Sequence, residues 1–275
     1  MSFELKRYVK NTPIRRYYFL PHRLKFALRS QSTPVKEIFK WLVNSNETSN
    51  FTYELTDLNR KYLCAFIAVV ANTTADTVES YISEIENDSQ FNSLIKNKTL
   101  SSADKYVSDS EVKLGRRLGW YALARIKKPK LIVETGVDKG LGSCVLTAAL
   151  LQNAKEGAPG KYLGTDINPD AGFLLGEPYN TYGKILYGDS IESLKKINEP
   201  IDFFINDSDH SIEYEYQEYQ AIRGKLTKDA TIIGDNSHLS DKLMRFAKET
   251  DRKFLFFQET PKNHWYRGAG IGAAF

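Results

Sequence analysis

Two short polar stretches of the sequence carry the side chains that metal and acid–base chemistry need. The stretch "NDSDHS" (206–211) follows the apolar run "IDFFI", and "GDNSH" (234–238) follows the apolar run "ATII". Each apolar run predicts a buried strand, and neighbouring strands in a sheet lie ~5 Å apart. If both strands end at the same edge, Asp207, Asp235 and Asn236 meet there. Three hard oxygen ligands of this kind suit Mg²⁺.

Two histidines, His210 and His238, flank this predicted metal site. Imidazole is the side chain best suited to proton transfer near neutral pH. In the alternative interpretation, Asp207 and Ser211 cap the helix "IEYEYQEYQAI" that follows, and Asp235 belongs to a turn. The recurrence of acidic residues at the same sheet edge favours chemistry over capping.

A glycine-rich stretch, "VETGVDKGLGS" (133–143), joins a predicted strand to a predicted helix. Gly136, Gly140 and Gly142 would let the backbone approach a ligand closely, and the helix N-terminus offers free N–H groups. The spacing is G-x-x-x-G-x-G, which differs from the G-x-G-x-x-G of dinucleotide-binding proteins. The stretch therefore predicts a ligand-binding turn, with an ordinary strand-to-helix turn as the alternative.

Acidic residues also follow the next two predicted strands. Asp166, in "LGTDINP", is placed to accept hydrogen bonds from ribose hydroxyls, although an Asp before Asn-Pro also suits a turn. Asp189, in "YGDS", could meet the exocyclic amine of an adenine. Capping of the next helix by Asp189 or Ser190 is an equally good interpretation.

The elements that would position these residues alternate between strand and helix. An amphipathic helix is predicted at 111–126, before the first strand. Seven strands are predicted, at residues 130–136, 161–166, 184–189, 201–207, 230–236, 253–258 and 268–275. The alternation implies an α/β fold, with a mostly parallel sheet and helices on both faces. Such sheets bind ligands at the carboxyl ends of their strands.

The N-terminal part of the chain has a different character. Residues 31–110 are acidic on balance, and the sequence predicts helices at 33–44, 57–72 and 74–95. We therefore predict two domains, a basic arm with a helical region at 1–110 and the strand-and-helix domain at 111–275.

Residues 1–30 carry eight basic residues against Glu4 alone, and aromatic residues are interleaved with them. Such a segment could lie on an anionic membrane surface or on a polyanion. The favoured alternative is an arm that packs on the protein's own body, because Pro13 and Pro21 break a long amphipathic helix.

The composition excludes several classes of protein. The net charge of the 275 residues is +4, which is too mild to indicate a nucleic-acid partner. No run reaches the ~18 apolar residues of a membrane span, and the N-terminus lacks the apolar stretch of a signal peptide. Cys64 and Cys144 give neither disulfide nor metal spacing. We expect a cytoplasmic protein in a reducing compartment.

Taken together, these motifs resemble those of a known family. "IVETGVDKGLGS", "GTDINP", "GDS", "FFINDSDHSIEYEYQEY" and "TIIGDN" are similar to motifs of the class I S-adenosylmethionine-dependent methyltransferases. The resemblance covers residues 111–275 and extends to the macrolide-sugar O-methyltransferases and the cephalosporin-hydroxylase-like branch. It implies a Rossmann-like, seven-stranded fold with S-adenosylmethionine as the cofactor.

The resemblance also implies cofactor-binding residues. The loop around the methionine part of the cofactor would consist of Glu134, Thr135, Gly136, Gly140 and Ser143. The ribose would be bound by Asp166, and the adenine would lie near Asp189 and Ser190.

The metal-dependent members of the family hold Mg²⁺ through an Asp after the fourth strand and an Asp-Asn pair after the fifth. These positions correspond to Asp207, Asp235 and Asn236. The resemblance thus implies O-methylation of a sugar or small-molecule hydroxyl, in which Mg²⁺ binds the acceptor oxygen and lowers its pKa. His210, together with Asp207, would be catalytic, with His210 as the base.

Three other functions stay open at this stage. A nicotinamide-dependent dehydrogenase is disfavoured by the glycine spacing. A non-enzymatic protein of membrane-surface or polysaccharide assembly would use the basic segment 1–30 and a methyltransferase-like fold. A metal-independent methyltransferase would use Asp207 directly on the acceptor. A homo-oligomer is compatible with each of these functions.

Overall fold

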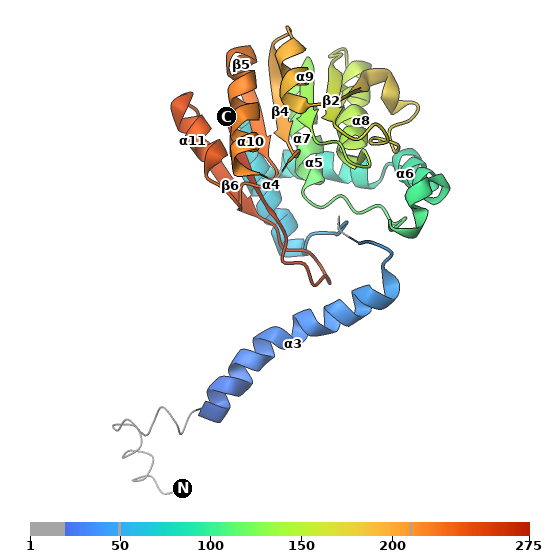
Figure 1. Cartoon of the computed structure of the whole chain (residues 1–275), viewed down its shortest axis with the longest axis vertical. Helices are drawn as coiled ribbons and strands as arrows, with labels where there is room; N and C mark the ends of the chain where they lie inside the picture. The colour runs from blue at the N-terminus through green and yellow to red at the C-terminus, as the bar shows by residue number, and fades with distance from the viewer. Residues whose placement is uncertain (1–19, 49–50, 210) are drawn as a thin grey trace, which may run out of the picture. The chain divides into compact units, whose positions relative to one another are not determined.

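Seven strands form one sheet at the centre of the fold (Figure 1). They span Leu131–Thr135 (β1), Lys161–Asp166 (β2), Gly183–Tyr187 (β3), Ile201–Asn206 (β4), Leu226–Gly234 (β5), Phe254–Gln258 (β6) and Gly270–Ala274 (β7). The computed structural model describes residues 20–48, 51–209 and 211–275. The strand order is β3-β2-β1-β4-β5-β7-β6, with β1 to β5 parallel and β7 antiparallel to its two neighbours. The predicted seven-stranded, mostly parallel sheet is confirmed.

Helices connect and cover the strands. The α-helices span Leu20–Asn44 (α3), Asp57–Ala71 (α4), Ala75–Glu86 (α5), Ser89–Ser101 (α6), Arg117–Lys127 (α7), Leu141–Lys155 (α8), Ser190–Lys196 (α9), Ile212–Ile222 (α10) and Lys242–Glu249 (α11). Short 3₁₀ helices span Ala103–Tyr106 (η1), Tyr179–Tyr182 (η2) and Arg223–Lys225 (η3).

The strand order reverses at β1, which pairs with β2 on one side and β4 on the other. Thr135 of β1 is level with Asn206 of β4, and Asn206 is level with Gly234 of β5. Residues that follow these three strands therefore emerge side by side at one edge. In open α/β sheets, this edge is where ligands bind.

The two faces of the sheet are covered by different helices, because successive strand residues point to opposite sides. Leu131 and Val133 of β1 belong to a buried cluster with α9, α10 and α11, in which the rings of Tyr219 and Phe246 stack at 5.5 Å. Glu134, the residue after Val133, points to the other face, where it contacts Ser143 of α8. Helix α7 packs on α8, and α4 and α5 pack on α7. The helical cover is the part of the N-terminal region that contains α4 and α5, residues 46–86, and it lies on the α7 face.

Two predicted helices differ from the observed ones. The single helix predicted at 74–95 is two helices, α5 and α6, because the Asp88 side chain accepts a hydrogen bond from Phe91 N (2.9 Å) and starts a new helix. The helix predicted from residue 111 begins only at Arg117. Gly115, with φ +51°, turns the chain just before it, and a side chain there would press on Tyr53 O at 3.2 Å.

The chain forms two compact units. The larger contains residues 46–262 and 267–275, and the smaller contains α3 and residues 263–266. Within the smaller unit, the rings of Trp41 and Trp265 meet edge-to-face at 5.4 Å.

Helix α3 is longer than the helix predicted at 33–44. The expectation that Pro21 prevents a long helix is wrong, because Pro21 lies in the first turn, where its missing N–H is not needed. Residues 1–19 of the predicted basic arm lie outside the described residues.

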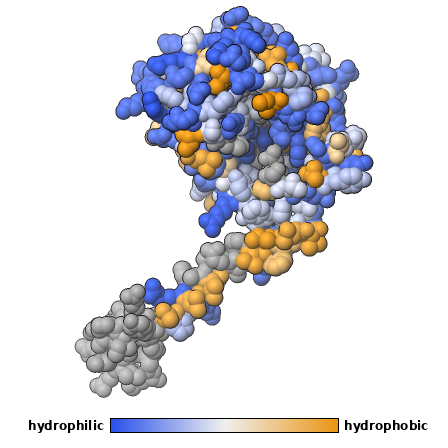
Figure 2. All heavy atoms as spheres, viewed as in Figure 1, coloured by the Kyte–Doolittle hydropathy of each residue, from blue (hydrophilic) through white to orange (hydrophobic). Residues whose placement is uncertain are grey.

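Large apolar side chains are exposed along α3, as Figure 2 shows. The exposed ones are Leu20, Leu24, Leu28, Val35, Ile38, Phe39, Leu42 and Val43. None of the helices in the described part of the chain is both long and apolar enough to cross a membrane.

Candidate functional site

Two acids, the buried Asp235 and the partly buried Asp207, meet where β4 and β5 end. Asp207 N donates to Thr135 O (2.8 Å) and Asp235 N donates to Asn206 O (2.9 Å), which fixes both backbones at the edge. The side chains of Asp207 and Asp235 are hydrogen-bonded to each other. The structure therefore brings together two of the three residues predicted as metal ligands.

Arg116, immediately before α7, pairs with Asp235. Its Nε and Nη2 atoms donate to the two carboxylate oxygens of Asp235. Its Nη1 atom lies 3.3 Å from Tyr53 Oη and 3.6 Å from Glu259 Oε1. Tyr53 Oη donates in turn to Glu259 Oε2 (2.7 Å). Asp235 and Glu259 are each only 1% exposed, so this network is closed to water.

The charges of the pair are unequal. Burial raises the pKa of Asp207, and the negative charge of Asp235 raises it further. Burial alone would also raise the pKa of Asp235, but the Arg116 guanidinium outweighs it and holds that pKa below its usual value. The shared proton therefore belongs to Asp207, and Asp235 is the ionised partner. Asp207 also faces Arg117, whose Nη2 lies 3.9 Å from its Oδ2.

The predicted magnesium ligands do not fit the ion in this arrangement. Mg²⁺ needs near-octahedral oxygen ligands at ~2.0–2.1 Å, but both oxygens of Asp235 already accept from a guanidinium. Among the described residues, no group of three or more His, Cys, Asp or Glu side chains is arranged to hold a metal. Asn236, the third predicted ligand, follows Asp235 in the same turn.

Of the two histidines predicted beside the metal site, the structure describes only His238. His210 lies outside the described residues. His238 accepts a hydrogen bond at Nδ1 from Gly270 N (3.0 Å), which ties the loop after β5 to the start of β7. A structural role is thus visible for His238.

On the cofactor side, Glu134 is the central buried acid. It accepts a hydrogen bond from Tyr162 Oη and a longer one from Ser143 Oγ (3.4 Å). Burial raises the pKa of Glu134 to about 7. Glu134 and Ser143 are therefore held together at the start of α8, next to the glycine-rich loop.

The glycine-rich loop is closely packed by backbone. Gly136 has φ +80°, and a Cβ there would lie 2.0 Å from Asp207 O. Gly140 has φ +96°, and a Cβ there would lie 2.9 Å from the Cα of Gly172. These positions require glycine for both conformation and space.

The Asp166 carboxylate fastens this loop. It accepts hydrogen bonds from Val137 N (3.0 Å) and Asp138 N (2.8 Å) at one oxygen, and from Asn168 N (2.8 Å) at the other. A carboxylate has about four acceptor positions, so one remains for a ribose hydroxyl.

The residues predicted near the adenine are held by α9 and α10. Asp189 is the N-cap of α9 and accepts from Glu192 N (2.8 Å) and Tyr214 Oη (2.9 Å). Hydrogen bonding to Glu192 N is the main reason why the pKa of Asp189 is lowered. Ser190 is buried, and its hydroxyl bonds to Tyr214 Oη (2.9 Å) and Glu218.

The sequence analysis missed Glu218, which is fully buried in α10. Glu218 accepts hydrogen bonds from four side chains, those of Thr135 (3.1 Å), Ser190, Asn206 and Ser208 (2.7 Å). It thereby joins the ends of β1 and β4 to α9. A signal was present, because Glu218 lies one turn before the apolar Ile222 on the same helix face.

The two arginines at the start of α7 were also missed. The sequence feature that could have indicated them is a pair of positive charges at the N-terminus of a predicted helix. A helix N-terminus carries the positive end of the helix dipole and disfavours arginine, so "GRR" before a helix indicates nearby acids.

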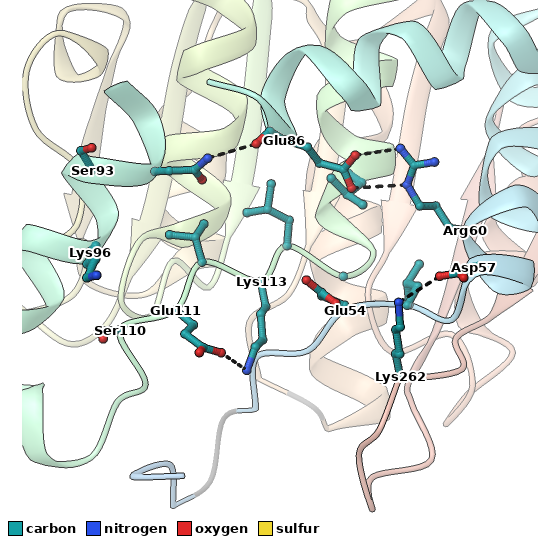
Figure 3. Close-up of a pocket in the computed structure, with 16 residues that line it drawn as sticks. Glu54, Asp57, Arg60, Glu86, Ser93, Lys96, Ser110, Glu111, Lys113 and Lys262 are labelled. Carbon is teal, nitrogen blue, oxygen red and sulfur yellow. Dashed lines mark hydrogen bonds and ion pairs between the residues drawn. The ribbon is translucent and has the colours of Figure 1, made fainter. Parts of the chain in front are cut away.

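A cavity of about 570 Å³ opens between the helical cover and the segment that leads to Arg116. Its lining contains the ion pairs Arg60–Glu86 (2.7 Å), Lys113–Glu111 (2.8 Å) and Lys262–Asp57 (3.1 Å), which Figure 3 shows around the opening. Ser110, Leu114 and Gly115 also line it. The wall of the cavity therefore combines paired charges with apolar side chains, and residues directly before Arg116 form part of it.

Comparison with known proteins agrees with this geometry. Residues 133–237 match the family described as a methyltransferase domain. The fold is similar to that of the O-methyltransferase TomG from Streptomyces achromogenes, which is involved in tomaymycin synthesis and whose structure contains SAM. The two are 16% identical, the alignment covers 66% of this chain and 88% of that chain, and the TM-score is 0.53.

The O-methyltransferase from Bacillus cereus, solved in complex with SAH, is 17% identical. Its alignment covers 72% of this chain and 96% of that chain, with a TM-score of 0.50. A search of curated proteins gives no match. Residues 133–237 are thus similar to a methyltransferase domain, and the sheet has the fold of these two O-methyltransferase structures.

Proposed function

We propose that this enzyme methylates a hydroxyl group of a sugar or another small molecule. The observation that supports this is the position of Asp207. Its side chain is 15% exposed, and its backbone touches the glycine-rich loop at Gly136. An acceptor hydroxyl between the loop and Asp207 would have the Asp207 carboxyl group as a hydrogen-bond partner that orients it.

The residues around the loop suit S-adenosylmethionine, whose sulfonium supplies an activated methyl group. We propose Asp166 for the ribose, because it retains an acceptor position. The methionine part is proposed to lie against Glu134, Thr135, Gly136, Gly140 and Ser143. The adenine is proposed to lie near Asp189, and Ser190 would act there by holding Tyr214.

The proposed reaction forms one O–CH₃ bond and breaks one S–CH₃ bond in line. The acceptor proton passes to His210, as the sequence predicts, and Asp207 orients the hydroxyl. Positioning of the two reactants can supply ~7–11 kcal/mol of the acceleration. Mg²⁺ has no step in this proposal, because Arg116 occupies the carboxylate that would bind it.

The cavity beside Arg116 is the proposed entrance for the acceptor. Its paired charges and Ser110 offer hydrogen-bond partners of both kinds, which suit a hydroxyl-rich molecule such as a sugar. A bulky Ser110→Trp substitution should abolish methyl transfer while S-adenosylhomocysteine binding stays unchanged.

The function is tested with the full chain and methyl-labelled S-adenosylmethionine. S-adenosylhomocysteine should raise the melting temperature and NAD should not. Label from a panel of sugars, macrolides and phenols should appear in methyl ether groups. Label found only on nitrogen, sulfur or carbon would show that the acceptor is not a hydroxyl.

We also propose peripheral contact between residues 1–30 and an anionic membrane. Leu20, Leu24 and Leu28 recur at helical spacing in the first half of α3 and are exposed, and Arg23 and Lys25 lie between them. Anionic liposomes should sediment the full chain but not a chain that lacks residues 1–30. Equal sedimentation of both would remove this role.

A further inference from the structure

Arg116 lies at the point where a divalent cation would be expected. Acids after β4 and β5 converge there, and two carboxyl groups at hydrogen-bond distance need either a proton or a cation between them. The structure supplies a cation, because Arg116 donates to both carboxylate oxygens of Asp235. Glu259 and Tyr53 close the other side of the guanidinium.

The guanidinium suits this place better than a metal ion does. Its planar fork matches the two oxygens of one carboxylate, and the pairing with Asp235 is of this two-point kind. Its remaining nitrogen faces a second buried acid, Glu259, at 3.6 Å. One arginine therefore forms a two-point ion pair with Asp235 and a longer electrostatic contact with Glu259.

The backbone conformation before α7 positions this arginine at the strand ends. Gly115 has φ +51° and turns the chain against Tyr53, so that Arg116 starts α7 with its side chain 12% exposed. A basic residue is unfavourable at a helix N-terminus. The acids at the strand ends are what compensates for it.

We propose that Arg116 is the resident cation of this site and replaces a divalent metal ion, so that the enzyme acts without one. In this role Arg116 is a positioning residue. It fixes Asp235 and leaves Asp207 as the group that can face the acceptor. The proposal concerns the same site as the proposed function, but its test measures metal binding and does not depend on the acceptor.

The test is Mn²⁺ binding to the full-length protein, followed through the EPR signal of free Mn²⁺. We expect no binding to the wild type at millimolar Mn²⁺. The R116A variant leaves Asp207, Asp235 and Glu259 without their cation and should bind Mn²⁺ at least ~10-fold more tightly than the wild type, which corresponds to ~1.4 kcal/mol. Mn²⁺ should also raise the melting temperature of this variant alone.

The matched control is R125A. Arg125 is a buried arginine within α7 and pairs with Glu84 (2.7 Å) and Glu156 (2.5 Å), far along the helix from the site. Its loss should lower the melting temperature without creating Mn²⁺ binding. An equal gain of Mn²⁺ binding in R125A and R116A would overturn the proposal. It would show that any acids left without their arginine bind Mn²⁺.

Two other results would overturn it. One is Mn²⁺ binding to the wild type that is lost in D235N, since Arg116 would then not exclude the metal. The other is a folded R116A that binds Mn²⁺ no better than the wild type. If R116A does not fold, the wild-type measurement decides, together with the shift in melting temperature on S-adenosylhomocysteine binding. That shift should be equal with EDTA and with Mg²⁺, and a shift that needs Mg²⁺ would contradict the proposal.

Discussion

The acidic residues in the two halves of the site edge obtain their hydrogen-bond and charge partners from different parts of the chain. At β2 and β3, Asp166 and Asp189 accept hydrogen bonds from backbone N–H groups within a few residues or in the adjacent loop. At β4 and β5, Asp235 pairs with Arg116, which is 119 residues away in the sequence, and Asp207 is hydrogen-bonded to Asp235. The proposed cofactor half is built locally, whereas the proposed acceptor half takes its cation from the segment between the helical cover and β1.

The largest effect should come from Asp235→Ala. It leaves Arg116 buried without its bidentate partner, and breaking a buried pair by removing one member costs ~3–5 kcal/mol. Urea unfolding should show this loss of free energy. Asp166→Ala is the matched control in the other half, where only backbone groups lose a partner. An equal loss in both variants would erase the distinction between the two halves.

The next effect is a pH dependence from Glu134. Its pKa is about 7 in the folded protein, above the ordinary value of 4.5. A raised pKa means that the folded protein binds the proton more tightly, so this contribution to stability is present below about pH 4.5 and is lost as the pH rises to 7. At ~1.36 kcal/mol for each pKa unit, the loss is about 3 kcal/mol.

Glu134→Gln should remove this contribution. The free energy of unfolding of the wild type, minus that of the variant, should therefore fall between pH 4.5 and 7. The measurement is urea unfolding at several pH values. A difference that stays constant over this range would contradict the assignment.

The third effect concerns cofactor affinity. Asp166→Ala should weaken S-adenosylhomocysteine binding by ~10–100-fold, because hydrogen bonds to a charged group contribute ~1.5–3 kcal/mol. Arg116→Lys keeps the charge in the acceptor half and should change this affinity much less. Calorimetric titration of both variants measures the contrast, and a larger loss in Arg116→Lys would reverse it.

The smallest effect is that of a helix cap. Asp189→Ala removes the side chain that accepts from Glu192 N and should cost ~1 kcal/mol of stability. Asp189→Asn, which can still cap, should retain most of that stability. Thermal unfolding of the two variants compares them, and equal losses would mean that capping is not the role of Asp189 in stability.

Features that depend on local sequence could be predicted, whereas contacts between distant segments could not. Strands such as 161–166 and 201–206 were predicted within a residue, because buried parallel strands appear as apolar runs with turns at both ends. The convergence of Asp207 with Asp235 follows from that pattern. The helix break at Asp88 was missed, because an N-cap inside a continuous helical pattern leaves no interruption in the apolar spacing.

The neighbours of these acids could not be predicted. Arg116, Tyr53 and Glu259 come from three distant segments, and no local pattern links them. The magnesium prediction rested on the acids alone, so it could not anticipate that a guanidinium fills the same place. The four partners of buried Glu218 could not be predicted for the same reason, since they lie on β1, on α9, at the end of β4 and just after it.

The link from Tyr53 through Arg116 to Asp235 also bears on how this enzyme could be re-engineered. The helical cover cannot be exchanged as an independent cassette, because it brings one hydroxyl of the network, and the segment that follows it brings the positive charge. A chimera joined at the first strand would keep the complete sheet and the glycine-rich loop. It would lose the counter-charge of its own acceptor half, unless the donor protein supplied an arginine at the same turn.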